Sequence, residues 1–249
     1  AVQAPTLNVT VAGVSVAALA VRAKGLRYSG KTLVVPEAAF TVKGAGESTL
    51  QGRVVLTGKE NLALAGTVKL PAGYWPKGLG DAPFATGALA GAYTVKGAFE
   101  DPQATLEGTV AHVQKEAYRV EALDVTAAIT KHKASASKAR GAFAGGRVAF
   151  TGSYTFGGGA TQANVTLKDA GLKALGADGV DGRLDGTLDV DGTLTRDVTR
   201  LGLVLDGVVK GLRRGDIHAV APVLVRSRLN WRGQTVRILD LDATTPGAR

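Results

Sequence analysis

Four stretches of the chain alternate apolar and polar residues with a period of two, and glycine closes each stretch at both ends. Each reads Gly, any residue, apolar, any residue, apolar, any residue, Gly. Successive side chains of a β-strand point to opposite faces, so the pattern predicts strands. Glycine and the large apolar residues share one face, and Arg, Thr, Lys and Asp mostly take the other. The copies are residues 52–58, 91–97, 146–152 and 186–192.

The second and fourth copies belong to a longer repeat, because their surroundings recur at an offset of 95 residues. The matching positions are Gly87 with Gly182, Leu89 with Leu184, Phe99 with Leu194, and Leu106 with Leu201. We therefore predict one continuous repetitive segment over residues 1–249, and we expect it to be a piece of a longer chain. Its repeat units lie near residues 44–70, 84–110, 141–168 and 180–206.

Three stretches depart from this rhythm. Residues 71–83 contain several Pro and Gly, and in residues 171–176 two leucines have helical spacing, so short helical turns or loops are expected in both. Near the start, the alternation ending at Val11 resumes in shifted phase at Val14, which predicts a bulged strand. The apolar run there is too short to span a bilayer.

The composition favours many short strands over long helices, with 34 Gly among 249 residues. Aromatic residues make up only 5%, so small aliphatic side chains must fill the interior. That suits a thin or open layer better than a thick core. The chain has no Cys, which excludes a disulfide framework and a thiolate metal site.

The formal net charge of +9 raises nucleic acid and anionic membranes as partners. The basic residues are dispersed, and the densest group has no interleaved aromatic residues for base stacking. That group is Lys131, His132, Lys133, Lys138 and Arg140. We interpret it as a solvated strand edge or loop and expect no nucleic-acid partner.

Residues 25–32 satisfy the letters of a phosphate-binding P-loop. The motif works only where it opens a helix, whereas Leu33, Val34 and Val35 follow here and favour a strand. The sequence predicts a hairpin, with Ser29 and Gly30 at its turn. Nucleotide binding is not expected.

Other candidate chemistry is weak. Asp185, Asp189 and Asp191 fall with Thr187 on the polar face of a predicted strand, so they spread along it and do not surround an ion. The three histidines lie far apart, and no nucleophile elbow or metal-binding His pair occurs. We expect no catalytic residues, no cofactor and no metal, and the chain is predicted not to be an enzyme.

The succession of motifs resembles the repeating signature of the TamB and AsmA-like family. Residues 172–175 followed by 180–194 carry the resemblance, as do residues 70–79 followed by 86–102, and residues 236–243 are similar to the strand that closes such units. The resemblance covers most of residues 44–249. Individual motifs are degenerate, so the match depends on their order.

The resemblance implies an all-β fold: an elongated, curved, antiparallel-type repeat sheet that forms a U-shaped groove, or β-taco, with one or two short helical turns. It also implies non-enzymatic phospholipid transport between the inner and outer membranes of a diderm bacterium, in support of outer-membrane biogenesis. The chain would lie in the periplasm or cell envelope, anchored through a segment outside this sequence. Its partners would be phospholipid acyl chains and, through other parts of the chain, membrane or envelope proteins.

The apolar positions of the repeat strands are the candidate groove lining. They are Val54, Leu56, Leu89, Tyr93, Val95, Val148, Phe150, Leu184, Leu188 and Val190. The alternative is a structural or adhesive cell-surface protein, built as a β-helix or β-sandwich, in which the same residues pack into a closed core. Periodicity alone does not separate the two, although frequent Gly and Ala beside isolated large residues favour the groove.

Overall fold

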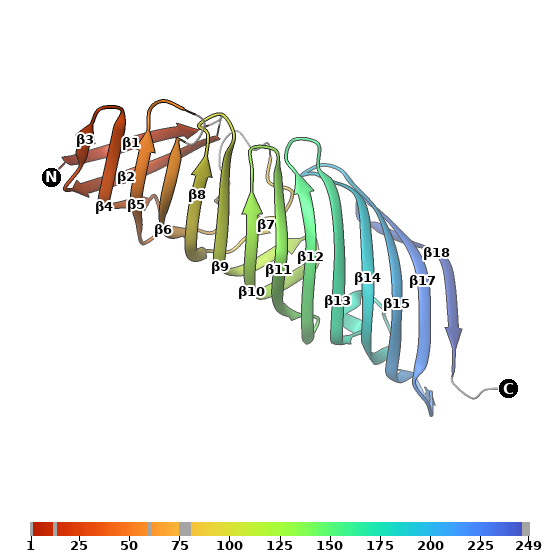
Figure 1. The fold of residues 1–249 in the computed structure, drawn as a ribbon. Helices are drawn as coiled ribbons and strands as arrows, with labels where there is room; N and C mark the ends of the chain where they lie inside the picture. The colour runs from red at the N-terminus through yellow and green to blue at the C-terminus, as the bar shows by residue number, and fades with distance from the viewer. Residues whose placement is uncertain (1, 12–13, 59–60, 75–80, 246–249) are drawn as a thin grey trace.

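A computed structural model describes residues 2–11, 14–58, 61–74 and 81–245 of the chain. These residues form one large antiparallel sheet of 18 strands that is not closed (Figure 1). The strands are β1 (Val2–Val11), β2 (Val14–Lys24), β3 (Arg27–Ser29), β4 (Thr32–Val42), β5 (Glu47–Val55), β6 (Leu62–Leu70), β7 (Ala85–Thr86), β8 (Leu89–Gly97), β9 (Pro102–Lys115), β10 (Tyr118–Ile129), β11 (Lys133–Phe143), β12 (Gly146–Thr155), β13 (Ala160–Gly171), β14 (Asp181–Leu194), β15 (Thr199–Arg214), β16 (Ile217–His218), β17 (Val223–Arg232) and β18 (Thr235–Thr244). A 3₁₀ turn, η1 (Lys173–Leu175), joins β13 to β14.

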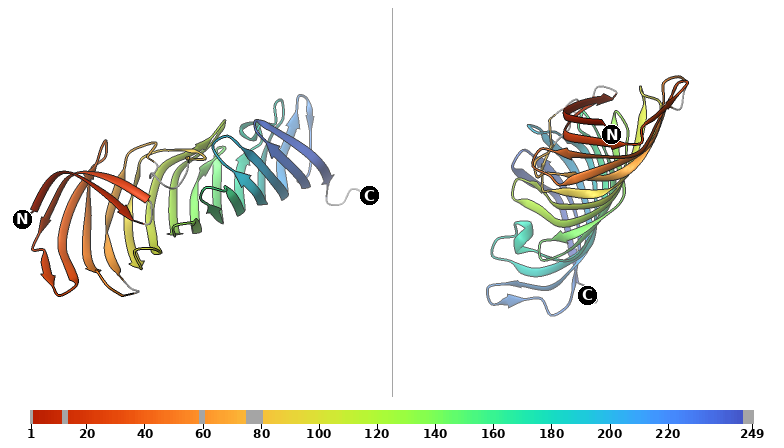
Figure 2. Two further views of the ribbon diagram at one scale, coloured as in Figure 1. Left: turned by 90° about the horizontal axis from the view of Figure 1, so that it is seen from above. Right: turned by 90° about the vertical axis from the view of Figure 1, so that its left-hand side faces the viewer.

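The long strands follow one another as a meander, each pairing antiparallel with the next long strand along the chain. Short strands extend it at the side: β3 pairs with β4, β7 with β9, and β16 with β15. The N-terminal and C-terminal strands therefore lie at opposite ends of a row (Figure 1). The strands are curved, so the sheet forms a long trough and not a flat layer (Figure 2).

This architecture confirms the predicted all-β, curved, groove-like repeat sheet. Three of the four repeat stretches lie inside strands, in β8, β12 and β14. The remaining stretch, residues 52–58, is only partly a strand. It falls at the end of β5, which starts at Glu47 and ends at Val55, short of Gly58. Asn61 caps this end of β5: its carbonyl accepts the N–H of Val55, and its side-chain amide donates to the carbonyl of Val55 at 2.8 Å.

The turn predictions have mixed outcomes. The 3₁₀ turn η1 confirms the helical spacing of residues 171–176. In the other stretch, residues 75–80 lie outside the described part, and the described remainder carries no helix. The bulged strand predicted near the start is wrong: β1 and β2 are two antiparallel strands, with Val11 opposite Val14, so the phase shift separates two strands.

The P-loop letters form a hairpin, as predicted, but its turn lies one residue later than expected. Ser29 ends β3 opposite Thr32, which begins β4. Gly30 and Lys31 form the turn, where Gly30 has a φ of +60°. A left-handed backbone suits glycine, and the residues that follow form a strand and not a helix.

Strand registers divide the sheet into two faces. We call the face that carries Leu188 and Val190 the inner face, and the opposite face, which carries Thr187 and Asp189, the outer face. Directly paired residues of adjacent strands point to the same side, so the registers extend both faces along the row. The largest buried cluster belongs to the inner face of the C-terminal half and includes Val148, Leu167, Ala170, Leu184, Val209 and Val223.

Glycines on the inner face let neighbouring backbones approach closely. Gly91 pairs with Gly108, and Gly186 pairs with Gly207. A Cβ added at Gly186 would lie 2.6 Å from the carbonyl oxygen of Asp206 and 2.9 Å from the Cα of Gly207. The curvature of the sheet therefore depends on the absence of side chains at these positions.

Gly186→Val is expected to lower the free energy of unfolding by about 3 kcal/mol, because no rotamer removes a clash between Cβ and backbone. The matched control is Gly202→Val, where the added Cβ would meet only the Asp191 carbonyl oxygen at 3.6 Å. Urea denaturation followed by circular dichroism measures both variants. Equal stability of the two variants would contradict the role given to Gly186.

Candidate functional site

The inner face carries continuous rows of apolar and small residues that run across the strands, along the axis of the trough. One row contains Tyr93, Leu106, Ala127, Ala136, Gly152, Ala163, Val190, Leu203 and Leu229, each paired directly with the next. The neighbouring row contains Gly91, Gly108, Val125, Ala139, Phe150, Val165, Leu188 and Leu205. The side chains in both rows are apolar or absent, apart from the hydroxyl of Tyr93.

Nine of the ten candidate lining residues lie on this face by register. Val54 pairs with Leu62, and Leu62 pairs with Gly97. Gly97 lies two residues after Val95 on β8, so Val54 and Val95 are on the same face. The others occupy the two rows or the inner positions next to them, and Leu89 pairs with Val110. Leu56 does not join them, because it lies in the bend after β5 and is 53% exposed.

Most of these side chains are only partly covered by protein. Val148 and Leu184 are buried, with 5% and 3% exposure. The remaining seven inner-face candidates are half-buried: Val54, Leu89, Tyr93, Val95, Phe150, Leu188 and Val190. A closed sandwich core would bury such residues almost completely. The inner face is therefore an open apolar groove over much of its length.

The inner face lies on the concave side of the sheet, because side chains from distant strands meet across it. The clearest of these contacts joins β10 to β17. Tyr118 and Trp231 form an edge-to-face ring pair with centroids 5.4 Å apart. Strands this far apart in one sheet can touch only if the sheet curls towards that face.

Five residues link the two rims of the groove, and we call them the cross-groove bridge: Lys115, Tyr118, Thr195, Arg196 and Trp231. The Nζ of Lys115 donates to the carbonyl oxygens of Thr195 and Arg196, each at 3.2 Å. The ring pair of Tyr118 and Trp231 reinforces this contact. The bridge crosses the mouth of the groove between the tip of the β9–β10 hairpin and the β14–β15 loop.

The two halves of the bridge come from opposite strand ends. Val120 near the hairpin tip pairs with Phe143, which pairs with Gly146, so these residues share one end of the strands. Leu194 and Thr199, which flank the β14–β15 loop, lie at the other end. Within the hairpin, Ala122 has a φ of +48° where the register between β10 and β11 shifts. Such a bulge bends a strand, which helps the hairpin to lean over the groove.

The outer face is polar and bound together by cross-strand contacts. The carboxylate of Asp185 accepts a hydrogen bond from Lys210 at 2.6 Å and from the Asp169 backbone N–H at 2.6 Å. The Lys210 contact, followed by the Asp169 contact, holds the pKa of Asp185 below its ordinary value. Asp189 accepts a hydrogen bond from Asn164. These exposed contacts confirm the predicted solvated face and add little stability individually.

Tyr93 is the polar exception on the inner face. Its hydroxyl donates to the Thr49 carbonyl oxygen at 3.1 Å. Burial raises the pKa of this hydroxyl from 10.0 to about 12. The surroundings of Tyr93 therefore disfavour an ionised group, as an apolar lining does.

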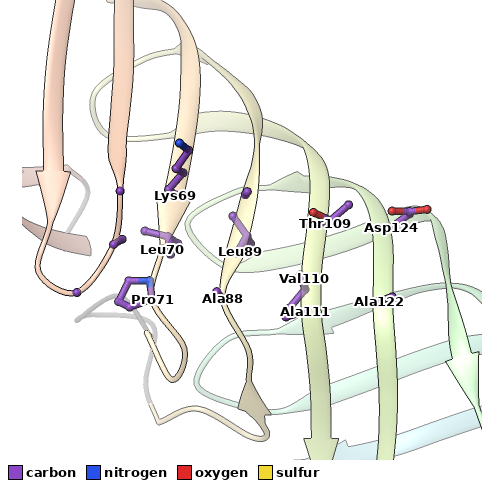
Figure 3. A pocket seen from close by; sticks show the side chains of 14 residues that line it. Lys69, Leu70, Pro71, Ala88, Leu89, Thr109, Val110, Ala111, Ala122 and Asp124 are labelled. Atoms are coloured by element: carbon purple, nitrogen blue, oxygen red, sulfur yellow. The ribbon is translucent and has the colours of Figure 1, made fainter.

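A hollow of about 500 Å³ lies at one rim of the sheet, over β6, β8, β9 and β10 (Figure 3). Four of the residues that line it are paired across adjacent strands, Lys69 with Ala90, Ala90 with Thr109 and Thr109 with Asp124. They therefore all belong to the outer face. Figure 3 shows Lys69, Thr109 and Asp124 along its upper side. Leu70, Leu89 and Val110, which pair in turn on the inner face, line it as well, and among the lining residues there is no nucleophile paired with a base.

Within the described part of the chain, no group of three or more His, Asp or Glu side chains is placed to hold a metal ion. The helical segments there include none that is long and apolar enough to cross a membrane.

Sequence reasoning missed much of the groove. The inner positions of β9 and β13, such as Leu106, Val110 and Val165, alternate with polar residues but lack the flanking glycines used to find the repeat. Relaxing the glycine requirement would have found them. The bridge residues have no local signal, because their partners lie about 80 or more positions away.

Comparison with protein-family models, with curated proteins and with solved structures gives no match to this chain.

Proposed function

We propose that the chain holds phospholipid acyl chains in its inner groove and serves as a non-enzymatic segment of a lipid-transport protein. The observation that supports this most directly is the open apolar face: its rows run along the trough, yet seven of the candidate side chains stay half-buried. An apolar face that its own chain leaves partly uncovered favours an apolar ligand.

Acyl chains fit this surface energetically. Burying one methylene group contributes about 0.8 kcal/mol, so about 15 methylenes contribute on the order of 10 kcal/mol before ordering costs. The two rows offer similar apolar environments from strand to strand. A lipid can therefore slide between positions of nearly equal energy, and no catalytic residue is required.

The wider setting follows from the resemblance to the TamB and AsmA-like family, and it is part of the proposal. The chain would act in the periplasm or envelope of a diderm bacterium, between the inner and outer membranes. Other parts of a longer protein would provide the membrane anchor and the contacts with envelope proteins. The groove would supply the apolar path between them.

A structural role is the second candidate, and one observation favours it. Around Leu184 and Val209 the inner face is buried by its own side chains, together with η1 residues such as Leu175. A sheet filled in this way along its whole length would leave no room for lipid. The half-buried residues Tyr93 and Val95 of the N-terminal half argue against complete filling.

Lipid extraction from the purified, folded chain, followed by mass spectrometry, separates the two functions. We expect phospholipid to co-purify with the chain and to remain after detergent-free washing. Folded chain that contains no lipid, and takes none up from phospholipid vesicles, would support the structural role instead.

A further inference from the structure

The two rims of the groove differ in charge. Each rim consists of the connections at one end of the strands, from the last residue of one strand to the first residue of the next. From β9 onward, the connections of one rim are residues 129–133, 155–160, 194–199 and 232–235, and those of the other are residues 115–118, 143–146, 171–181 and 214–223. The first rim contains four Lys or Arg residues and one Asp, so we call it the basic rim, whereas four Asp or Glu residues outnumber three Lys or Arg residues on the second. The charged residues of the basic rim are Lys131, Lys133, Arg196, Asp197 and Arg232.

Two arginines face each other directly at the basic rim. Arg200, the second residue of β15, pairs with Arg232, the last residue of β17. Both are exposed, and neither forms an ion pair with an acidic side chain of the described part of the chain. Like charges directly opposite each other destabilise a sheet. The pair lies within the row of strands, because β15 has β14 on its other side and β17 has β18.

Other cations on the outer face of the same strands are compensated by aspartate. Arg226 pairs directly with Asp206, with Nε and Oδ1 2.6 Å apart, and Lys210 lies 2.6 Å from the carboxylate of Asp185. The chain supplies no such partner to Arg200 and Arg232. Their charge is therefore available to an anion from outside the chain.

Further positive charge gathers beside this arginine pair. The Gly233 N–H donates to the Thr199 carbonyl oxygen at 3.1 Å, so the β17–β18 turn lies against the start of β15. On the connection that precedes β15, the Nζ of Lys115 is held by the carbonyl oxygens of Thr195 and Arg196. The result is a cluster of four cations, which we call the basic cluster: Lys115, Arg196, Arg200 and Arg232.

The apolar lining of the groove begins one residue away from the arginine pair. Leu201 and Trp231 are the neighbours of Arg200 and Arg232 along the strands, and they pair with each other. Leu201 lies two positions before Leu203 of the inner face, so this second pair faces inward. An apolar pair inside the groove thus meets a cationic pair at its rim.

We propose that the basic cluster binds the phosphate group of a phospholipid whose acyl chains lie in the groove. This inference rests on the proposed function, because it places the headgroup of the same ligand. Directly opposite side chains begin about 5 Å apart at their Cβ atoms, so one phosphate can accept hydrogen bonds from both arginines. The planar guanidinium donates in pairs to phosphate oxygens, and the bound anion removes the repulsion between the two arginines.

Two lipids that differ only in the phosphate test the assignment. Phosphatidylmethanol carries one phosphodiester, and diacylglycerol with the same two octanoyl chains carries none. Isothermal titration calorimetry measures the binding of each to the folded chain. We expect phosphatidylmethanol to bind about tenfold more tightly than diacylglycerol.

The variant Arg200→Gln/Arg232→Gln removes the cationic pair. It should weaken phosphatidylmethanol about tenfold and leave diacylglycerol nearly unchanged. Its thermal unfolding temperature should be equal to or above that of the unmodified chain, because the substitution removes repulsion. The matched control is Arg213→Gln/Arg214→Gln, which removes two exposed arginines from the opposite end of β15 and should change neither affinity.

Each contrary result has a distinct meaning. Equal binding of phosphatidylmethanol by the glutamine variant and the unmodified chain, or an equal loss in the control, would overturn the headgroup site and leave the groove proposal standing. Binding of neither lipid would overturn both. Inorganic phosphate that binds as tightly as phosphatidylmethanol would assign the cluster to free phosphate, and tighter binding of a single-stranded oligonucleotide would assign it to nucleic acid.

Discussion

Replacing Val95 and Val190 with aspartate together should remove nearly all bound phospholipid while the strand content stays largely unchanged. Both side chains are half-buried on the inner face, and Val190 lies in the row that contains Tyr93. An ionised carboxylate among acyl chains is costly to desolvate. In an open groove, however, the same carboxylate can stay hydrated once lipid is absent, so the sheet need not unfold.

The control carries the same two charges on the outer face. Thr94→Asp is suitable because Thr94 faces outward, where its hydroxyl is hydrogen-bonded to the hydroxyl of Thr105 at 2.7 Å. An aspartate carboxylate at this position can accept a hydrogen bond from Thr105 instead. The second outer-face change is Thr166→Asp. Thr166 pairs with the uncharged residues Ala149 and Thr187, whereas an aspartate at Thr187 would lie opposite Asp206 and be repelled by it. The control should keep its lipid, as quantified by mass spectrometry.

A closed core predicts a different result for the Val95→Asp/Val190→Asp variant. Two carboxylates inside a packed interior would destabilise the fold by several kcal/mol, so strand content would be lost. The unmodified protein would also carry no lipid. Thermal unfolding recorded with the lipid measurement therefore distinguishes an interrupted groove from a disrupted core.

Opening the cross-groove bridge should accelerate lipid transfer about tenfold. A phospholipid with its tails in the groove keeps its headgroup at the mouth, where the contacts of Lys115 and Tyr118 cross from rim to rim. Passage along the groove therefore requires these contacts to separate. Lys115→Ala/Tyr118→Ala removes a charge-assisted contact and an aromatic pair worth together about 1–2 kcal/mol, which favours the open mouth.

Transfer of a fluorescent phospholipid between donor and acceptor vesicles measures this rate. The matched control is Arg119→Ala on the same hairpin, because the Arg119 guanidinium pairs with the carboxylate of Glu121 two residues along the same strand, with Nε and Oε1 2.6 Å apart. Its removal should leave the rate nearly unchanged. A bridge variant that transfers lipid no faster than the unmodified chain would show that the bridge does not limit passage.

Local patterns predicted the parts of the fold that depend on neighbouring residues. Alternation placed Leu188 and Val190 on one face and Asp189 on the other, and the spacing of Leu172 and Leu175 predicted the 3₁₀ turn. Both depend on backbone geometry over a few residues. The scarcity of aromatic residues indicated a thin or open layer, whereas the curved sheet was expected from the resemblance to the TamB and AsmA-like family.

Features that depend on distant partners could not be predicted from these patterns. The strand containing Val54 ends at Val55, where Asn61 bonds the backbone of Val55, and Leu56 lies beyond this end and is exposed. The bridge joins Lys115 to a loop about 80 residues away, and periodicity carries no information on such a contact. The alternation of apolar residues changes phase at Val14, and such a change fits either a bulge within one strand or a turn between two strands. Only the pairing of β1 with β2 shows that it is a turn.

Photolabelling with a phospholipid that carries a diazirine on its acyl chain tests the open apolar groove most directly. After irradiation of the loaded, folded chain, peptide mass spectrometry locates the labelled residues. We expect labels on inner-face positions such as Tyr93, Phe150 and Val190, and few on the outer-face positions Thr94 and Thr166. Labels spread equally over both faces, or absent from the inner face, would contradict the account.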